Sequence, residues 1–120
     1  MTRVLIVDDD DSLAEIWLDC LREEGFDPYY VCPDSDTLTN LASGRYSMDI
    51  LITDFSMPGL TGLEVCAAAK QLDCPPRVIL VTGFEPHSLP ETGCADLVLG
   101  KPLSLRLLLD AVRRLAAYVY

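Results

Sequence analysis

Residues 3–12 read RVLIVDDDDS, a short apolar run that leads straight into four consecutive aspartates. The run has no polar alternation, which is typical of a strand buried on both faces of a parallel sheet. Similar runs recur at residues 49–53 (DILIT), 77–82 (RVILVT) and 95–100 (ADLVLG), and residues 28–32 (PYYVC) supply a fifth. The sequence therefore predicts five strands in one sheet.

The segments between these strands have helical spacing. In the first of them the apolar residues follow one helical face, at Leu13, Ile16, Trp17, Cys20 and Leu21. We expect Ser12 and Glu15 to form a capping box at the start of this helix and Gly25 to end it. Weaker patterns predict helices near residues 35–43, 62–72 and 103–117.

Strands that alternate with helices predict an α/β fold, because parallel strands need crossover helices on both faces of the sheet. Five strands fit the flavodoxin-like, doubly wound order 2-1-3-4-5. In that order a ligand binds beyond the carboxyl ends of the strands, between the first and the third. We therefore expect the functional residues at that edge of the sheet.

Length and charge limit what the chain does. Its 120 residues, half of them hydrophobic, fit one domain that spans residues 1–120. The net charge of -10 disfavours direct binding to nucleic acid or anionic membranes and favours protein or cation partners.

No segment has the pattern of a secretion signal or a membrane span. The five cysteines lack metal-ligand spacing, and we interpret them as small core residues of a cytoplasmic protein.

Polar residues follow four of the predicted strands: Asp8, Asp9, Asp54, Thr82, Gly83 and Lys101. Aspartates just before a helix can simply stabilise its N-terminus, and this interpretation fits Asp10 and Asp11. Asp8, Asp9 and Asp54 would instead repel one another at close range, and a divalent cation relieves such repulsion. Carboxylate oxygens without histidine or cysteine ligands favour Mg²⁺.

Asp54 lies where a predicted strand runs into a loop. A carboxylate beside a magnesium ion is a potential nucleophile that can form an acyl phosphate. In that chemistry Lys101 supplies a positive charge to the phosphoryl group and Thr82 supplies a hydroxyl. The backbone amides of Phe55 and Gly83 supply further donors.

Together these motifs resemble the receiver domains of two-component response regulators over essentially the whole chain. The matching segments are VLIVDDDDS (4–12), DILITDFSMPGLTGLEV (49–65), VILVTG (78–83) and GKP (100–102). The resemblance implies that Asp54 is the phosphoacceptor. It also implies that Asp9 binds Mg²⁺ directly, that Asp8 does so largely through water, and that the Ser56 backbone carbonyl completes the ligands.

The resemblance further implies a signalling switch rather than an enzyme. The implied phosphoryl donor is a histidine kinase or a phosphotransfer protein, and the implied receiver of the signal is a downstream effector protein or domain. Thr82 and Lys101 would contact the phosphoryl group on Asp54, and phosphorylation would shift a two-state equilibrium. Whether the chain acts alone or within a longer regulator stays open.

Two regions depart from the family pattern. Residues 84–94 are shorter than usual and contain two prolines and a glycine, which predicts a short or degenerate fourth helix. The position three before Lys101 usually holds an aromatic ring that rotates on activation. Here it is Val98, so we expect altered switching through the fifth strand.

Two positions of the family flank the water that hydrolyses the acyl phosphate, and in this chain they are Ser56 and Phe84. The Phe84 ring can shield the phosphoryl group and donates no hydrogen bond to an attacking water. Slow autodephosphorylation is the expected consequence. The alternative is that Phe84 only packs against the loop.

The apolar residues of the last predicted helix form two stripes. The stripe expected to face the sheet consists of Leu105, Leu108, Leu109, Val112 and Leu115. Leu107, Ala111 and Tyr118 form the second stripe, which predicts a partner or homodimer contact. A helix that is buried more deeply than average is the alternative.

Two other functions stay open. A magnesium-dependent phosphohydrolase with an aspartyl nucleophile would resemble haloacid-dehalogenase-like phosphatases, but those carry a second aspartate at the position of Ser56. A receiver-like interaction module with altered switching would fit Val98 and the degenerate fourth helix. Turnover of a phosphomonoester would indicate the enzyme. Phosphorylation without a change in shape or partner affinity would indicate the module.

Overall fold

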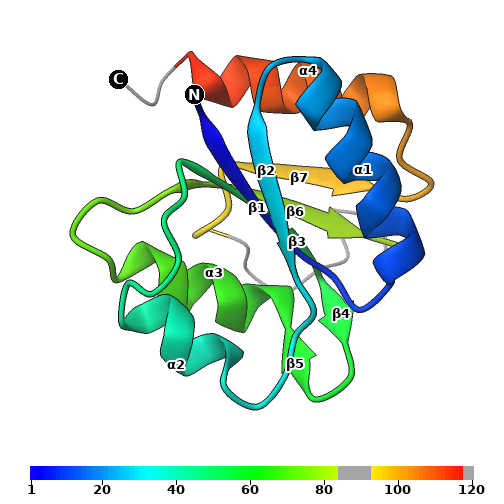
Figure 1. Ribbon diagram of the computed structural model, residues 1–120. Coiled ribbons are helices and arrows are strands. Elements are labelled where there is room, and N and C mark those ends of the chain that lie inside the picture. The colour runs from blue at the N-terminus through cyan, green and yellow to red at the C-terminus, as the bar shows by residue number, and fades with distance from the viewer. Residues whose placement is uncertain (84–92, 118–120) are drawn as a thin grey trace.

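The computed structural model describes residues 1–83 and 93–117, and they form a parallel sheet covered by helices on both faces (Figure 1). The order of the strands is β2-β1-β3-β6-β7, which confirms the predicted order 2-1-3-4-5. In chain order the strands are β1 (Arg3–Val7), β2 (Asp27–Val31), β3 (Ile50–Asp54), β6 (Arg77–Thr82) and β7 (Leu97–Gly100). The described helices are α1 (Asp11–Glu23), α2 (Thr37–Ala42), α3 (Gly62–Lys70) and α4 (Leu105–Ala116).

The sheet separates two apolar layers. Helices α1 and α4 cover one face, and α2 and α3 cover the other (Figure 1). Val4 and Ile6 of β1 point to the first layer, and Leu5 and Val7 point to the second. All four side chains are fully buried. Burial on both faces explains why the strand sequences show no polar alternation.

Helix α1 begins two residues earlier than the predicted capping box requires. Its N-cap is Asp10, whose carboxylate accepts a hydrogen bond from the Leu13 amide at 3.1 Å. The predicted cap by Ser12 is therefore wrong, because Ser12 lies inside the first turn. The predicted end is correct: the helix stops before Gly25, which adopts a positive φ of 90°.

The loop after β3 contains structure that the sequence did not predict. Strands β4 (Ser56–Met57) and β5 (Leu60–Thr61) form an antiparallel hairpin, with Gly59 at a φ of 72° in its turn. Thr61, the last residue of the hairpin, forms a reciprocal capping box with Glu64 at the start of α3. The hairpin and the cap fix the path of the chain from the end of β3 into α3.

Helix α4 presents most of the predicted stripe to the sheet, since Leu109 also packs against the core, but the limits of the buried face differ. Its buried residues are Leu108, Ala111, Val112 and Leu115, whereas Leu105 is 40% exposed. Ala111 shares the buried face because it lies three positions after Leu108 and four before Leu115. It is therefore not part of an exposed stripe. Leu107 is 55% exposed, and Tyr118 lies outside the described residues.

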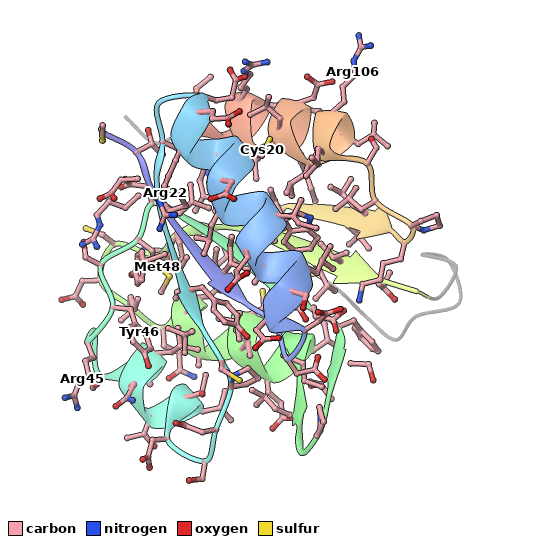
Figure 2. All side chains as sticks on the ribbon, turned by 45° about the vertical axis from the view of Figure 1, so that its right-hand side comes forward. Cys20, Arg22, Arg45, Tyr46, Met48 and Arg106 are labelled. Atoms are coloured by element: carbon pink, nitrogen blue, oxygen red, sulfur yellow. The ribbon has the colours of Figure 1, made fainter. Side chains whose placement is uncertain are left out.

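The cysteines do not all belong to the core. Cys66 is buried among apolar side chains, where burial raises its pKa to about 12, but Cys32 and Cys74 are exposed. Cys20 is half-buried where α1 lies beside α4 (Figure 2). In the same view, the exposed Arg106 side chain near the start of α4 points away from the protein. The prediction that the cysteines are core residues is thus wrong for the exposed two.

The predicted short fourth helix at residues 84–94 falls largely outside the described residues, which resume at residue 93. Among the described residues, no helix is long and apolar enough to cross a membrane.

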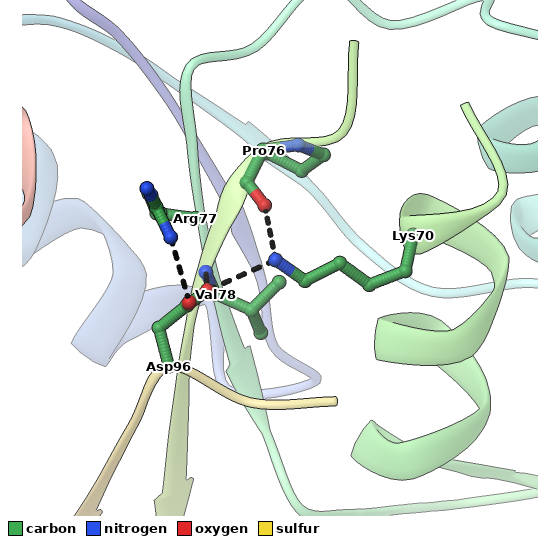
Figure 3. A network of polar contacts seen from close by, with 5 residues as sticks. All are labelled: Lys70, Pro76, Arg77, Val78 and Asp96. Atoms are coloured by element: carbon green, nitrogen blue, oxygen red, sulfur yellow. Dashed lines mark hydrogen bonds and ion pairs between the residues drawn. The ribbon is translucent and has the colours of Figure 1, made fainter. Parts of the chain in front are cut away.

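Asp96 joins three segments at the amino edge of the sheet (Figure 3). One carboxylate oxygen accepts hydrogen bonds from Lys70 of α3 at 3.0 Å and from the Val78 amide of β6 at 2.7 Å. The other oxygen accepts one from Arg77 at 3.3 Å. Lys70 also donates to the Pro76 carbonyl at 2.7 Å. Asp96 therefore ties the beginning of β6 and the residue before β7 to the end of α3.

Replacing Asp96 by asparagine is expected to lower the free energy of unfolding by about 1–3 kcal/mol, because charge-assisted hydrogen bonds are lost. Partial burial acts to raise the pKa of Asp96, but the Val78, Lys70 and Arg77 contacts outweigh it and lower this pKa. The stabilisation is therefore present above the ordinary pKa of 3.8 and is lost as the pH falls below it.

Urea unfolding at neutral and acidic pH measures this difference, and Asp110→Asn at an exposed position of α4 is the control. A loss no larger than that of the control, expected within about 0.5 kcal/mol, would contradict the structural role of Asp96.

Candidate functional site

The carboxyl edge of the sheet brings three carboxylates together. Asp8 follows β1, Asp9 comes next, and Asp54 ends β3. One oxygen from each of these side chains lies within 4.8 Å of the others. Asp8 is fully buried, Asp54 is 5% exposed and Asp9 is exposed. The cluster therefore opens to solvent on the side of Asp9.

Lys101 approaches the same cluster from the segment after β7. Its Nζ atom lies 2.9 Å from an oxygen of Asp54, and its backbone amide donates to the Thr82 carbonyl at 2.7 Å. Partial burial acts to lower the pKa of Lys101, but the hydrogen bond to Asp54 and the charges of Asp8 and Asp9 raise it overall. Lys101 therefore stays protonated and offsets part of the negative charge.

The backbone around Asp54 is held on two sides. The Phe55 amide donates to the Val81 carbonyl of β6 at 2.8 Å, and the Gly62 amide donates to the Phe55 carbonyl at 2.7 Å. A Cβ atom on Gly62 would lie 2.4 Å from the Asp54 carbonyl oxygen, which no side chain tolerates. Glycine at this position therefore lets α3 start directly against the end of β3.

Asp8 is a fully buried carboxyl group whose surroundings disfavour its charged form. One of its oxygens accepts a hydrogen bond from the Asp10 amide at 2.9 Å. The other oxygen is buried and has no hydrogen-bond partner within residues 1–83 and 93–117. Burial raises the pKa of Asp8 to about 6, the Asp10 amide opposes this rise, and the Asp54 carboxylate adds to it. A divalent cation would give the orphaned oxygen a partner and favour the charged form.

The other residues predicted for the site differ in their burial. Thr82 ends β6 and is almost fully buried, whereas Gly83 and Ser56 are exposed. Phe55 is half-buried between β3 and β4. Val98 lies half-buried on β7, and Phe84, the residue predicted to slow autodephosphorylation, lies outside the described residues. Asp10 caps α1, as the alternative for it had suggested.

Two features of the site had no signal in the sequence. The Tyr30 hydroxyl of β2 donates a hydrogen bond to the Asp8 carbonyl at 2.7 Å. A mostly apolar pocket of about 500 Å³ also opens beside the cluster, and it is lined by Leu13, Trp17, Lys101, Pro102 and Leu103. Both features join residues from separate elements, so only the folded chain shows them.

A family model described as the response regulator receiver domain matches residues 4–113. The chain belongs to this family. Receiver domains are signalling modules rather than enzymes, and phosphorylation by a histidine kinase is typical of them. The acidic cluster is typical of a receiver site that binds Mg²⁺.

Relatives of this receiver domain are longer proteins. The DNA-binding response regulator MtrA of Mycolicibacterium smegmatis is 36% identical over 98 residues, which cover 82% of this chain and 39% of MtrA. The sensory transduction protein RegX3 of Mycobacterium tuberculosis is 34% identical over 116 residues, which cover 94% of this chain and 50% of RegX3. The chain thus spans about two fifths to one half of the length of these relatives.

Solved receiver structures have the same fold. The response regulator protein TrrA of Thermotoga maritima, in complex with Mg(2+)-BeF, matches with a TM-score of 0.81 at 27% identity over 96% of this chain and 99% of TrrA. TrrA in complex with the histidine kinase ThkA matches with a TM-score of 0.79 at 28% identity over 96% of this chain and 98% of TrrA. A receiver protein of Sinorhizobium medicae has a TM-score of 0.84 at 23% identity over 99% of this chain and 97% of that protein, and it supports the fold alone.

Replacing Asp8 by asparagine is expected to stabilise the metal-free domain at about pH 7.5 by about 1–3 kcal/mol, because a buried charge is removed. The folded state binds the Asp8 proton more tightly than the unfolded chain, whose carboxyl has the ordinary pKa of 3.8. Wild-type stability therefore falls as the pH rises through the interval between 3.8 and about 6.

Urea unfolding without divalent cations, at about pH 7.5 and about pH 4, measures the difference between the two proteins. The advantage of Asp8→Asn should shrink at the lower pH. Equal stability of the two proteins at the higher pH would show that the buried carboxylate carries no such cost.

Proposed function

We propose that this receiver domain accepts a phosphoryl group on Asp54 from a histidine kinase or a phosphotransfer protein, in a reaction that requires Mg²⁺, and that phosphorylation changes its contacts with an effector protein. The observation that carries the proposal is the contact of Asp54 with Lys101 inside the cluster of three carboxylates. This arrangement combines a nucleophilic oxygen, a cation and a metal-type ligand set at one point.

The chemistry is a transfer between two nucleophiles. An oxygen of Asp54 attacks the phosphorus atom, the bond from phosphorus to the donor histidine nitrogen breaks, and an acyl phosphate forms. Mg²⁺, held by Asp8, Asp9, Asp54 and the Ser56 carbonyl, would neutralise charge on the phosphoryl oxygens.

The residues of this chain have separate tasks in the transfer. The Lys101 ammonium contacts Asp54 before the reaction, and it would contact a phosphoryl oxygen after it. Thr82 ends the strand next to Asp54 and would supply its hydroxyl, and the Gly83 amide would supply a further donor. The Phe55 amide, the other predicted donor, instead donates to the Val81 carbonyl.

Acetyl phosphate with Mg²⁺ is expected to add one phosphoryl group to the wild-type domain and none to Asp54→Asn. Intact-protein mass spectrometry measures the product, and omission of Mg²⁺ should abolish it. Asp9→Asn should reduce the initial rate at least about tenfold through loss of a metal ligand. The matched control is Asp11→Asn, which changes an exposed aspartate in the first turn of α1 and should leave the rate unchanged.

The alternatives make different predictions in this experiment. A phosphoryl adduct on Asp54→Asn would place the modification elsewhere and overturn the proposal. An adduct that leaves the shape and the partner affinity unchanged would favour an interaction module with altered switching, for which Val98 on β7 supplies a reason. Steady turnover of a phosphomonoester would favour the phosphohydrolase.

We further propose that the phosphoryl donor docks on the pocket beside Lys101. A donor histidine must approach within bonding distance of Asp54, so the donor protein must contact the surface around it. The pocket is next to Lys101, and its other lining residues are apolar, including Leu13 of α1. On the exposed side of the same helix, Ile16 adds an apolar side chain that is 52% exposed. TrrA, a relative of known structure, was solved in complex with a histidine kinase.

Leu13→Ala is expected to slow transfer from an autophosphorylated histidine kinase domain about tenfold and to leave phosphorylation by acetyl phosphate unchanged, because only the protein donor needs the pocket. For this assay, the donor is chosen as the kinase domain that transfers its phosphoryl group fastest to the wild type among a panel of purified kinase domains. Leu107→Ala, at an exposed leucine of α4, is the control and should keep both rates. Equal slowing with both donors would indicate damage to the site itself and count against docking.

A further inference from the structure

Tyr30 links β2 to the acidic loop that follows β1. The two strands pair as far as Val7 and Val31, so the Asp8 carbonyl lies just beyond the last paired residues. The Tyr30 hydroxyl reaches this carbonyl and donates a hydrogen bond of 2.7 Å. The hydrogen-bonded connection between the strands is thereby extended to the first residue of the acidic cluster.

The position of Asp9 depends on the backbone to either side of it. Asp9 is exposed, so packing does not hold its side chain as it holds Asp8. On one side, the Asp8 carbonyl is fixed by Tyr30. On the other side, the Asp10 amide donates to the Asp8 carboxylate at 2.9 Å, and Asp10 itself caps α1. The peptide groups on both sides of Asp9 are therefore anchored.

We propose that Tyr30 is a positioning residue of the magnesium site, because its hydroxyl fixes the Asp8 carbonyl and so holds the Asp9 carboxylate beside Asp8 and Asp54. The inference deepens the proposed function and rests on it, since it concerns the metal site that the function requires. It assigns to a β2 residue a task in a site built from the other strands.

The surroundings of the hydroxyl suit a permanent donor. Burial raises the pKa of Tyr30, and a hydrogen bond with the Cys32 side chain and the negative charges of Asp11 and Asp8 raise it further. A tyrosine phenol is protonated at physiological pH, so the Tyr30 hydroxyl acts there as the donor to the Asp8 carbonyl.

The neighbouring residue provides a matched control. Tyr29 lies on the same strand, and its hydroxyl also donates a hydrogen bond to a backbone carbonyl, that of Ser47. Ser47 precedes β3, whose opposite end carries Asp54, so this bond lies at the amino edge of the sheet. Tyr29→Phe and Tyr30→Phe thus remove the same kind of bond at opposite edges.

The test is a Mg²⁺ titration of the ¹⁵N-labelled wild type, Tyr30→Phe and Tyr29→Phe, followed by amide chemical shifts. Tyr30→Phe is expected to raise the dissociation constant for Mg²⁺ about three- to tenfold, and Tyr29→Phe to change it less than about twofold. A change of less than about twofold in Tyr30→Phe would overturn the proposal. An equal weakening in both variants would also overturn it, because general destabilisation would then be the cause.

A kinetic readout separates positioning from chemistry. With acetyl phosphate as donor, Tyr30→Phe should need more Mg²⁺ for the half-maximal rate and reach the wild-type rate at saturation. A lower saturating rate with unchanged Mg²⁺ dependence would contradict a positioning role. If the wild type itself binds no Mg²⁺, the proposed function fails and this inference fails with it. If the wild type binds Mg²⁺ and Tyr30→Phe binds it equally well, the proposed function stands and only this inference fails.

Discussion

Repulsion among Asp8, Asp9 and Asp54 is the constraint on which the site depends. The parallel sheet places the ends of β1 and β3 side by side, so the carboxylates that follow these strands lie close together. Lys101 offsets one of the charges, and burial raises the pKa of Asp8 to about 6. The site therefore favours any ligand that brings positive charge, which is the property required for a metal-dependent phosphoryl acceptor.

The rest of the fold holds this unfavourable cluster in place. Two apolar layers bury the side chains of β1, β3 and β6 apart from Arg3 and Arg77, and the hydrogen bonds of Asp96 stabilise the amino edge of the sheet, away from the site. At the carboxyl edge the supports are more local: Gly62 lets α3 start against Asp54, Asp10 caps α1, and Tyr30 holds the Asp8 carbonyl. The stabilising contacts of Asp96 thus lie at the amino edge of the sheet, and the functional carboxylates lie at its carboxyl edge.

The errors of the sequence-based predictions have a common cause. Ser12 and Glu15 have the spacing of a capping box, but Asp10 takes the cap because the helix starts one residue before Ser12. In the last helix, periodicity identified an apolar face but misplaced its limits, since Leu105 is exposed and Ala111 is buried. In both helices the sequence pattern identified a helix correctly. Where the helix begins and how it packs against the sheet then decided which residue caps it and which residues are buried.

The sequence by itself determined the five strands, their order and the carboxylates that follow β1 and β3. The strands appear as apolar runs, and the helices between them favour a parallel sheet of this order. The ends of the strands then place the carboxylates at one edge of the sheet. Only the tertiary structure decided that Tyr30 supports Asp8 and that a pocket opens beside Lys101. It also brings Lys101 within 2.9 Å of Asp54, as the predicted role of Lys101 implied. Tyr30 and Asp8 lie 22 positions apart, and residues that line the pocket lie up to 90 positions apart. Such pairings follow from register and packing rather than from any spacing along the chain.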